Sequence, residues 1–494
     1  MPATWPKNPT IYEINTWVWL GELSQRYGRR VTLNSVPASE WDAIAAWGFD
    51  AVWFMGVWER SPLGISIALQ SPLLWAEMRH LLPDLRQEDI AGSPYCIRRY
   101  VVDERLGGPE GLAVARQELD RRGMRLILDY VPNHVAPDHP WVSEHPDFFI
   151  QGKAADLARD PKAFLKVGDG IFARGRDPYF PPWSDVLQLN TFHPGLRQAT
   201  VDAVSAIAAQ CDGMRCDMVM LLMTDIFART WGKRAGARPA KEYWQELIPA
   251  VRTRHPGVIF IAEAYWDLEW ALLQQGFDYC YDKRLYDRLE RETAESVRLH
   301  LLAGLGYQEK LVRFIENHDE PRAAAVLGPD KGRAAAVTIA SLPGAKLFHE
   351  GQFEGFQVKL HVFLGRRPLE APDLELQDFY RQLLRTIKAE VFRCGEWQLC
   401  EIKGWPDNPS YQKLAAWCWR NGEDRYLITI NLSDNATYGL VSLPWDDLAG
   451  HTWHLQDTLN GEAFERDGGG MVKPGLFVGL GPWKFHFFRI SLRS

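Results

Sequence analysis

The sequence predicts an α/β protein: a closed (β/α)8 barrel with a short inserted domain after the third strand and a C-terminal antiparallel β-sandwich. Two observations predict it. Short runs of β-branched and aromatic residues alternate with helical stretches through the first three quarters of the chain, as in repeated βαβ units. From about residue 395 the helical patterns stop, and strand-like runs follow one another between Asn, Asp and Gly turns.

Eight runs are typical of barrel strands. They are Ile11–Asn15, Ala51–Met55, Arg125–Tyr130, Gly213–Asp217, Val258–Glu263, Phe277–Tyr281, Leu311–Glu316 and Lys346–Phe348. Between them apolar residues recur at helical spacing, as at Leu112, Ala115 and Leu119. We therefore expect residues 1–133 and 191–390 to form the barrel.

Two segments depart from this alternation. Residues 134–190 carry seven prolines and no helical period, which indicates a loop-rich inserted domain at the barrel mouth. Residues 395–494 contain strand-like runs at Lys413–Trp419, Arg425–Ile430 and Trp483–Ile490, and their tryptophans are expected in the core.

Composition excludes several classes of protein. There are 56 Lys and Arg against 63 Asp and Glu, a net charge of −7, which disfavours a nucleic-acid binder and favours neutral partners. No apolar stretch is long enough to span a membrane, and the first residues lack a leader pattern, so we expect a soluble, cytoplasmic protein. Seven scattered cysteines are expected to be buried, reduced thiols. The oligomeric state is left open.

Acidic and polar residues follow several of the predicted strands, where a barrel places its catalytic groups. They are Asp129 at the end of the third strand, with Asn133 and His134 after it, Arg215 and Asp217 on the fourth, Glu263 at the end of the fifth, and Glu316 to Glu320 at and after the end of the seventh. Buried carboxylates are costly unless they are paired or used, so several at one mouth indicate chemistry.

Two of these acids suit glycoside hydrolysis, which needs one ionised and one protonated carboxyl. Arg215 and Asp217 lie two apart on a strand and point to the same side, so the guanidinium can hold Asp217 ionised as a nucleophile. Glu263 lies between Ala262 and Ala264, where apolar walls would favour its protonated form as the acid.

At these residues the chain resembles the α-amylase family, glycoside hydrolase family thirteen, over its whole length. Six segments carry the resemblance, in the family's order. They are Asp129-Tyr-Val-Pro-Asn-His134, Asp185-Val-Leu-Gln-Leu-Asn190, Gly213-Met-Arg-Cys-Asp217, the strand end at Glu263, Phe314-Ile-Glu-Asn-His-Asp319 and Leu342-Pro-Gly-Ala-Lys-Leu-Phe-His-Glu-Gly-Gln352.

The resemblance implies a retaining hydrolase of α-1,4-glucosidic bonds in malto-oligosaccharides or in glycogen and starch fragments. Asp217 would be the nucleophile, Glu263 the acid/base, and Asp319 the carboxylate that binds sugar hydroxyls. Residues expected to contact the sugar or support the site are Asp129, His134, Arg215, His318, Tyr95 and Trp266.

The chain departs from the family at three places. Where many starch-cleaving members have Lys-His, it has Met220-Leu221, so the usual acceptor-side contacts are missing. The inserted segment has few acidic partners for calcium, so no cofactor is expected to be required, and Asn133 is the one candidate ligand if calcium is bound. Where the family has Gly-Tyr-Asp, the chain has Ser93-Pro-Tyr95-Cys96, so Tyr95 would stack on the sugar after a one-residue shift.

These departures leave other functions open. One is a transglycosylase or an enzyme for trehalose, sucrose or maltose, because Met220 and Leu221 are apolar. Another is a non-catalytic amylase-like scaffold that binds sugar, although such proteins generally lose an acid and all three are present here. Metal catalysis is not favoured, because the spacing of His134, His139 and His145 is not one that binds zinc. Five tryptophans are candidates either for sugar stacking or for packing: Trp53, Trp58, Trp141, Trp183 and Trp266.

Overall fold

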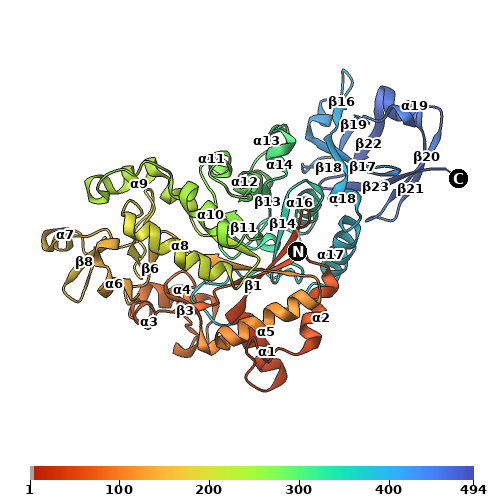
Figure 1. The fold of residues 1–494 in the computed structure, drawn as a ribbon. Coiled ribbons are helices and arrows are strands. Elements are labelled where there is room, and N and C mark those ends of the chain that lie inside the picture. Colours follow the sequence, from red (N-terminus) through yellow and green to blue (C-terminus); the bar gives the residue numbers. More distant parts are fainter. Residues whose placement is uncertain (1–4, 494) are drawn as a thin grey trace. The chain divides into compact units, whose positions relative to one another are not determined.

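The computed structural model describes residues 5–493 and contains a closed eight-stranded parallel barrel (Figure 1). All eight predicted strands are confirmed. They close in the order β1-β14-β13-β12-β11-β10-β5-β2. Their bounds are β1 Thr10–Asn15, β2 Ala51–Met55, β5 Arg125–Tyr130, β10 Gly213–Cys216, β11 Ile259–Ala262, β12 Tyr279–Tyr281, β13 Leu311–Arg313 and β14 Ala345–His349.

By contacts between residues, the described chain forms two compact units. The first comprises residues 12–281 and 358–369, and the second comprises residues 5–11, 282–357 and 370–493. No helix within residues 5–493 is both long and apolar enough to cross a bilayer. Six of the seven cysteines are buried, all seven are free thiols, and Cys394 is exposed.

In the first unit, helices alternate with the strands and bury the predicted faces. Leu112, Ala115 and Leu119 are all buried on α5, and α8 packs against α10 (Figure 1). Pro194 begins α8, whose first turn is capped because the His193 side chain accepts from the amide of Leu196. The bounds are α1 Thr16–Tyr27, α2 Ala38–Trp47, α3 Pro62–Leu69, α4 Pro72–Leu81, α5 Gly108–Arg121, α8 Pro194–Ala208, α9 Thr224–Trp231, α10 Tyr243–Arg254 and α11 Glu269–Gln274.

Residues 134–190 form small sheets with their own apolar clusters rather than a plain loop. Strand β6 (His134–Val135) pairs with β9 (Leu187–Gln188), and β7 (Phe164–Val167) forms a hairpin with β8 (Gly170–Ala173). The segment also contains two short helices, α6 Trp141–Glu144 and α7 Ala154–Arg159, which the sequence did not predict. A further excursion between β2 and α5 holds α3, α4 and the antiparallel pair of β3 (Trp58–Arg60) with β4 (Ile97–Val102).

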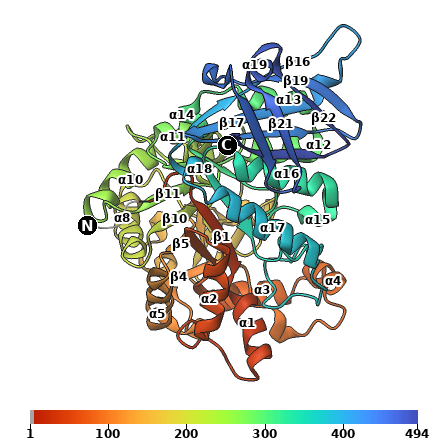
Figure 2. The same ribbon diagram turned by 90° about the vertical axis from the view of Figure 1, so that its right-hand side faces the viewer.

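The second unit contains the C-terminal sheets, which Figure 2 shows together. A six-stranded sheet has the order β15-β17-β18-β23-β20-β21, and a three-stranded sheet has the order β16-β19-β22. Leu427 of one sheet and Val478 of the other share one core, as predicted for a sandwich. The bounds are β15 Glu396–Leu399, β16 Glu401–Lys403, β17 Leu414–Asn421, β18 Asp424–Asn431, β19 Thr437–Ser442, β20 Thr452–Asp457, β21 Ala463–Asp467, β22 Leu476–Leu480 and β23 Phe485–Leu492.

Except for the short α19 (Gly468–Gly470), the α-helices described in this unit lie before the C-terminal sheets in the chain. Trp417 and Trp419, buried as predicted, donate their indole N–H groups to Ser341 at the end of α16. Trp483 was also expected in the core, but it is only half-buried because it lies in the turn before β23, near Lys331. The helices are α12 Lys283–Arg291, α13 Ala294–Leu301, α14 Leu305–Gln308, α15 Ala323–Val326, α16 Pro329–Ser341, α17 Leu374–Ile387 and α18 Val391–Cys394.

Candidate active site

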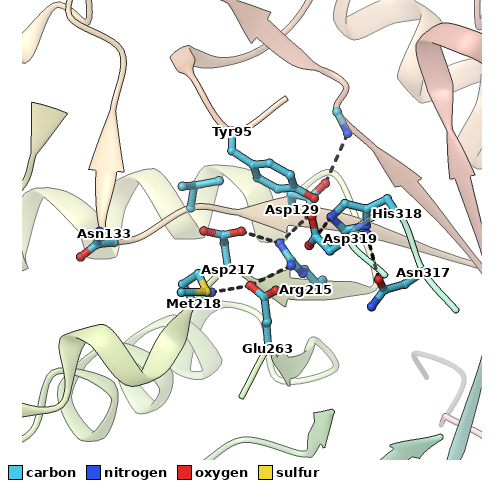
Figure 3. Close-up of polar contacts among 12 residues, drawn as sticks. Tyr95, Asp129, Asn133, Arg215, Asp217, Met218, Glu263, Asn317, His318 and Asp319 are labelled. Carbon is cyan, nitrogen blue, oxygen red and sulfur yellow. Dashed lines mark hydrogen bonds and ion pairs between the residues drawn. The ribbon is translucent and has the colours of Figure 1, made fainter. Parts of the chain in front are cut away.

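One buried guanidinium contacts three carboxylates in the first unit (Figure 3). Arg215 lies on β10, whose register pairs it with Asp129 of β5. Its Nη1 atom is 2.8 Å from Asp217 Oδ1 and 3.6 Å from Asp129 Oδ1, and its Nη2 atom is 2.8 Å from Glu263 Oε2. The geometry thus brings together four residues that the sequence placed at the ends of three strands.

The environment of Arg215 keeps this group charged. Burial acts to lower the pKa of the guanidinium, but Glu263, the aromatic hydroxyls and Asp217 outweigh it, so the pKa lies well above its ordinary value. Aromatic rings surround the cation, with centroids 5.3 Å from Cζ for Trp53 and for Tyr95, and 5.9 Å for Tyr281. Arg215 therefore holds its partners as a fixed, buried cation.

Asp129 is held by two tryptophans. Trp53 Nε1 donates to Asp129 Oδ2 at 3.2 Å, the Gly56 amide donates to the same oxygen at 3.3 Å, and Trp58 Nε1 donates to the Asp129 carbonyl at 2.8 Å. Both indoles are almost fully buried. Trp53 and Trp58 consequently orient an acid and do not offer a face to a sugar.

Glu263 lies among donors, so the apolar surroundings expected from Ala262 and Ala264 were wrong. Besides Arg215, its carboxylate accepts from the Met218 amide at 2.7 Å and from the Tyr265 hydroxyl at 2.9 Å. Met218 has φ 44° and ψ 44°, a left-handed conformation that is uncommon for a residue with a side chain. This turn, directly after Asp217, aims the amide at Glu263.

Tyr95 contacts this group, whereas Trp266 contacts Tyr179 of the inserted domain. The ring of Tyr95 faces the Arg215 guanidinium and is partly exposed (Figure 3). Trp266 follows β11, has φ 64°, and meets the edge of the exposed Tyr179 ring at 5.0 Å between centroids. A positive φ at a bulky residue costs free energy and tends to occur at functional sites.

His134 lies on β6, at the start of the inserted domain. Its ring packs against Trp183 with 4.9 Å between centroids, and Asn133 Nδ2 lies 3.3 Å from its Nδ1. Burial lowers the pKa of His134 to about 3, so the ring is neutral at physiological pH. A neutral imidazole can both donate and accept a hydrogen bond.

Asn133, the candidate calcium ligand, is occupied by another amide. Gln188 Nε2 donates to Asn133 Oδ1 at 2.8 Å and to the Asn133 carbonyl at 3.0 Å, while Asn133 Nδ2 donates to Gln188 Oε1 at 3.2 Å. Calcium would need these oxygens together with carboxylates. In the described part of the chain, the one group of acids and histidines with metal-like spacing is Asp457, Glu462 and His486, in the C-terminal sheets. The residues around Asn133 do not fit a calcium ion.

In the second unit, Asp319 follows β13 in a capped turn. Asn317 Oδ1 accepts from the amides of Asp319 and Glu320 at 2.9 Å each, and His318 Nε2 lies 2.9 Å from Asp319 Oδ2. The Asp319 side chain is 40% exposed, whereas His318 is buried. Asp319 is therefore oriented by its neighbour and accessible to a ligand.

The two other acids of this segment have structural partners. Glu316 is buried, lies 2.6 Å from Arg322, and accepts from the Ala323 amide at 2.7 Å. Burial raises the pKa of Glu316, and Arg322 opposes that effect. Glu320 lies 3.4 Å from Lys283.

Met220 and Leu221 are buried at 0% and 4% exposure, in a short helical turn after Asp217. They do not line an acceptor site. The residue left partly exposed directly after Asp217 is Met218.

Comparison with known proteins agrees with this geometry. Residues 44–275 match the model of the α-amylase catalytic domain, a stretch that contains Asp129, Arg215, Asp217 and Glu263. This stretch of the chain is identified by the match as an α-amylase catalytic domain. The α-amylase MalA of Haloarcula japonica is 23% identical over 454 residues, which cover 88% of this chain and 57% of that protein. An α-1,4-glucan:maltose-1-phosphate maltosyltransferase of Bifidobacterium longum is 25% identical over 206 residues, covering 39% of this chain and 23% of that protein.

Solved structures of the α-amylase family share the fold. The noncanonic maltogenic α-amylase AmyB of Thermotoga neapolitana has a TM-score of 0.69 at 19% identity, covering 98% of this chain and 99% of that one. An α-amylase of Lactobacillus plantarum has a TM-score of 0.68 at 20% identity, covering 98% of each chain.

Sequence reasoning missed two contacts to Glu263 in this α-amylase fold. Tyr265 lies two residues further along, so its hydroxyl could have been proposed from strand parity. The contact from the Met218 amide could not have been proposed from the sequence, because a methionine does not indicate a left-handed backbone conformation.

Proposed function

We propose that the chain is a retaining α-glycosidase that hydrolyses α-1,4-glucosidic bonds in malto-oligosaccharides or in glycogen and starch fragments. One observation supports this above others: Asp217 and Glu263 contact the two terminal nitrogens of one guanidinium. Their carboxyl groups are therefore close. Retaining enzymes hold the two groups about 5–5.5 Å apart, whereas inverting enzymes leave about 6.5–9.5 Å for a water molecule.

The proposed reaction has two displacements. Asp217 attacks the anomeric carbon while Glu263 gives its proton to the departing glycosidic oxygen, which leaves a covalent glycosyl-enzyme and a free sugar hydroxyl. Glu263 then takes a proton from water, whose oxygen displaces Asp217 from the same carbon. Two inversions give net retention, and both acids return to their starting states.

The remaining motif residues bind the sugar or position these acids. Asp319 is accessible and would accept hydrogen bonds from sugar hydroxyls, with His318 orienting it. The neutral ring of His134 would serve as a hydrogen-bond partner, and Tyr95 and Trp266 would offer aromatic faces. Arg215 acts through Asp217 and Glu263, which it contacts, and Asp129 acts through Arg215.

A product profile tests this proposal. The protein is incubated with maltoheptaose, glycogen, maltose, sucrose and trehalose, with and without chelator, alongside Asp217→Asn, Glu263→Gln and the surface control Asp225→Asn. Asp225 pairs with Arg238 on the surface. We expect short α-anomeric products from maltoheptaose, unchanged by chelator and by the control, and lost in both site variants. Failure to cleave any α-glucan would refute hydrolysis, and turnover that depends on Glu263 would exclude a non-catalytic scaffold.

Glycosyl transfer is the second candidate, supported by the relatives named as maltosyltransferases. The apolar pair Met220 and Leu221 no longer favours it, since both are buried. The same assay separates the two functions. If products longer than the substrate dominate when maltose is added as acceptor, or when maltose 1-phosphate is the donor, the enzyme is a transferase.

A further inference from the structure

Three exposed aromatic rings form a row on the three-stranded sheet of the C-terminal domain. Phe477 on β22 is the middle ring, 6.4 Å from Tyr438 on β19 and 6.3 Å from Trp405 between centroids. The planes differ by only 21° and 29° respectively. The exposed fractions are 46% for Tyr438, 56% for Phe477 and 43% for Trp405. We call these three residues the aromatic row.

The sheet presents these rings because its residues alternate between two faces. Leu476, Val478 and Leu480 of β22 are buried in the sandwich core, while Phe477 and Gly479 face away from it. Figure 2 shows β16, β19 and β22 side by side in the C-terminal domain. This face is outside the apolar core that holds the domain together.

Gly479 gives the Tyr438 ring room to lie over the strand. The register places Tyr438 opposite Gly479, and a Cβ on that glycine would lie 3.0 Å from Tyr438 Cδ1 and 3.2 Å from Cε1. These separations are too tight for ordinary carbon contacts. A side chain at position 479 would push the ring out of the row.

The loop that carries Trp405 is hydrogen-bonded to β19, the strand of Tyr438. Asn408 Nδ2 donates to the Tyr438 carbonyl at 2.8 Å, and the Tyr438 amide donates to Ser410 Oγ at 3.0 Å. Trp405 and Asn408 are themselves bridged through their backbones. The row is thus built in advance, which lowers the entropy cost of binding a ligand.

Tyr438 and Phe477 also line a hollow of about 630 Å³. This volume is in the range of sites for small molecules, about 300–1,000 Å³. The hollow combines aromatic faces with hydrogen-bonding groups of both charges. Besides Tyr438, the polar side chains that line it are Asn460, Glu462, Arg466, Lys484 and His486.

A metal ion is a poorer occupant of this hollow. Although Asp457, Glu462 and His486 have metal-like spacing, the Asp457 carboxylate already accepts from the amides of Leu459 and Asn460 and from the Asn460 side chain. His486 Nδ1 lies 2.8 Å from the same carboxylate. Few lone pairs of Asp457 remain for a cation.

We propose that the aromatic row is a non-catalytic binding site for a chain of α-linked glucose residues. Flat, nearly parallel, exposed rings suit the apolar faces of pyranose rings, and the polar lining suits their hydroxyl groups. The choice of an α-glucan rests on the proposed function. A site for a neutral chain needs no strong excess of one charge, and the hollow is lined by the acidic Glu462 as well as by the basic Arg466 and Lys484.

The test measures glucan binding without turnover. In the Glu263→Gln background, migration of the full chain through native gels containing glycogen or amylopectin is compared for the starting protein, Tyr438→Ala with Phe477→Ala, and Gly479→Val. The control is Leu492→Ala, a residue 54% exposed on β23 of the same domain. We expect both row variants to bind roughly tenfold more weakly and the control to bind unchanged.

Two further readouts keep the outcome clear. When the row variants are made in the active enzyme, with Glu263 intact, kcat/KM for maltotriose should stay unchanged, because the aromatic row is not part of the active site. Thermal unfolding checks that the variants are folded. Equal retardation of all folded variants would overturn the proposal, as would a row variant that changes only the oligomeric state, because the row would then be an interface between copies. Retardation in glycogen by a protein that cleaves no glucan would refute the proposed function and leave this site standing.

Discussion

Arg215 Nη2 lies 2.8 Å from Glu263 Oε2 in a buried ion pair, and the other terminal nitrogen of the same guanidinium lies 2.8 Å from Asp217. The proposed nucleophile and the proposed acid/base are thus positioned by one side chain. Arg215 is 1% exposed and cannot adjust to one partner without moving relative to the other. The planar fork of arginine is what makes this sharing possible.

Replacing Arg215 with lysine should therefore cost activity although the charge is retained. A lysine ammonium is a point charge and cannot reach both carboxylates with the same geometry. We expect kcat on maltoheptaose to fall about 10²–10³-fold, the size reported for losing one preorganised donor. Arg215→Met should lower the free energy of unfolding by about 3–5 kcal/mol, because it leaves buried carboxylates unpaired. A lysine variant with normal kcat would contradict this role.

The hydrogen bonds between the side chains of Asn133 and Gln188 should make the free energy of unfolding independent of calcium. Gln188 is fully buried, and its Nε2 donates to two oxygens of Asn133. We expect Gln188→Leu to lower the free energy of unfolding by about 1–3 kcal/mol, because the Asn133 amide loses its partner. The exposed Gln70→Leu is the control. Calorimetry with chelator and with added calcium should give the same Tm, and a calcium-dependent rise would overturn our description of Asn133.

Asp185 should destabilise the protein near neutral pH. Burial raises the pKa of Asp185 from its ordinary value of 3.8 to about 6. The folded state therefore binds the proton more tightly, so stability is lost as pH rises from about 4 to about 6, by an amount on the order of 3 kcal/mol. Asp185→Asn removes this loss, and its stability relative to wild type should increase across that window.

Urea unfolding at several pH values checks the Asp185 prediction. The depressed pKa of His134, about 3, gives the opposite trend, so only the difference between variant and wild type at each pH is informative. A constant difference from pH 4 to pH 7 would refute the prediction.

Met218 should tolerate glycine better than a β-branched residue. Its left-handed backbone, φ 44°, is open to glycine and strained for valine. We expect Met218→Val to be less stable than Met218→Gly by about 1–2 kcal/mol. The valine variant should also lose kcat, since a changed turn withdraws the amide from Glu263. Thermal unfolding and maltoheptaose kinetics measure both effects, and equal behaviour of the two variants would show that the turn is unimportant.

The barrel was predictable because each of its strands is a short apolar run, and Asp129, Asp217 and Glu263 stand out at the ends of such runs. The excursion holding α3 and α4 was missed, because the apolar residues of α3 have no clear helical face. The surroundings of Glu263 were mispredicted since they depend on a backbone turn at Met218 and not on the alanines beside it. Likewise, the buried positions of Met220 and Leu221 depend on how the chain turns after β10, which local sequence does not determine.

Three carboxylates share one guanidinium in the buried group around Arg215. With Glu263 protonated for its role as the acid, Asp129 and Asp217 leave the group with one negative charge in excess. A neutral glucan gains little from that imbalance, whereas a sugar ring that develops positive charge at its anomeric carbon is attracted to it. The same imbalance should favour inhibitors whose ring bears a protonated amine over their neutral, equally shaped counterparts, with a preference that disappears as the amine loses its proton at high pH.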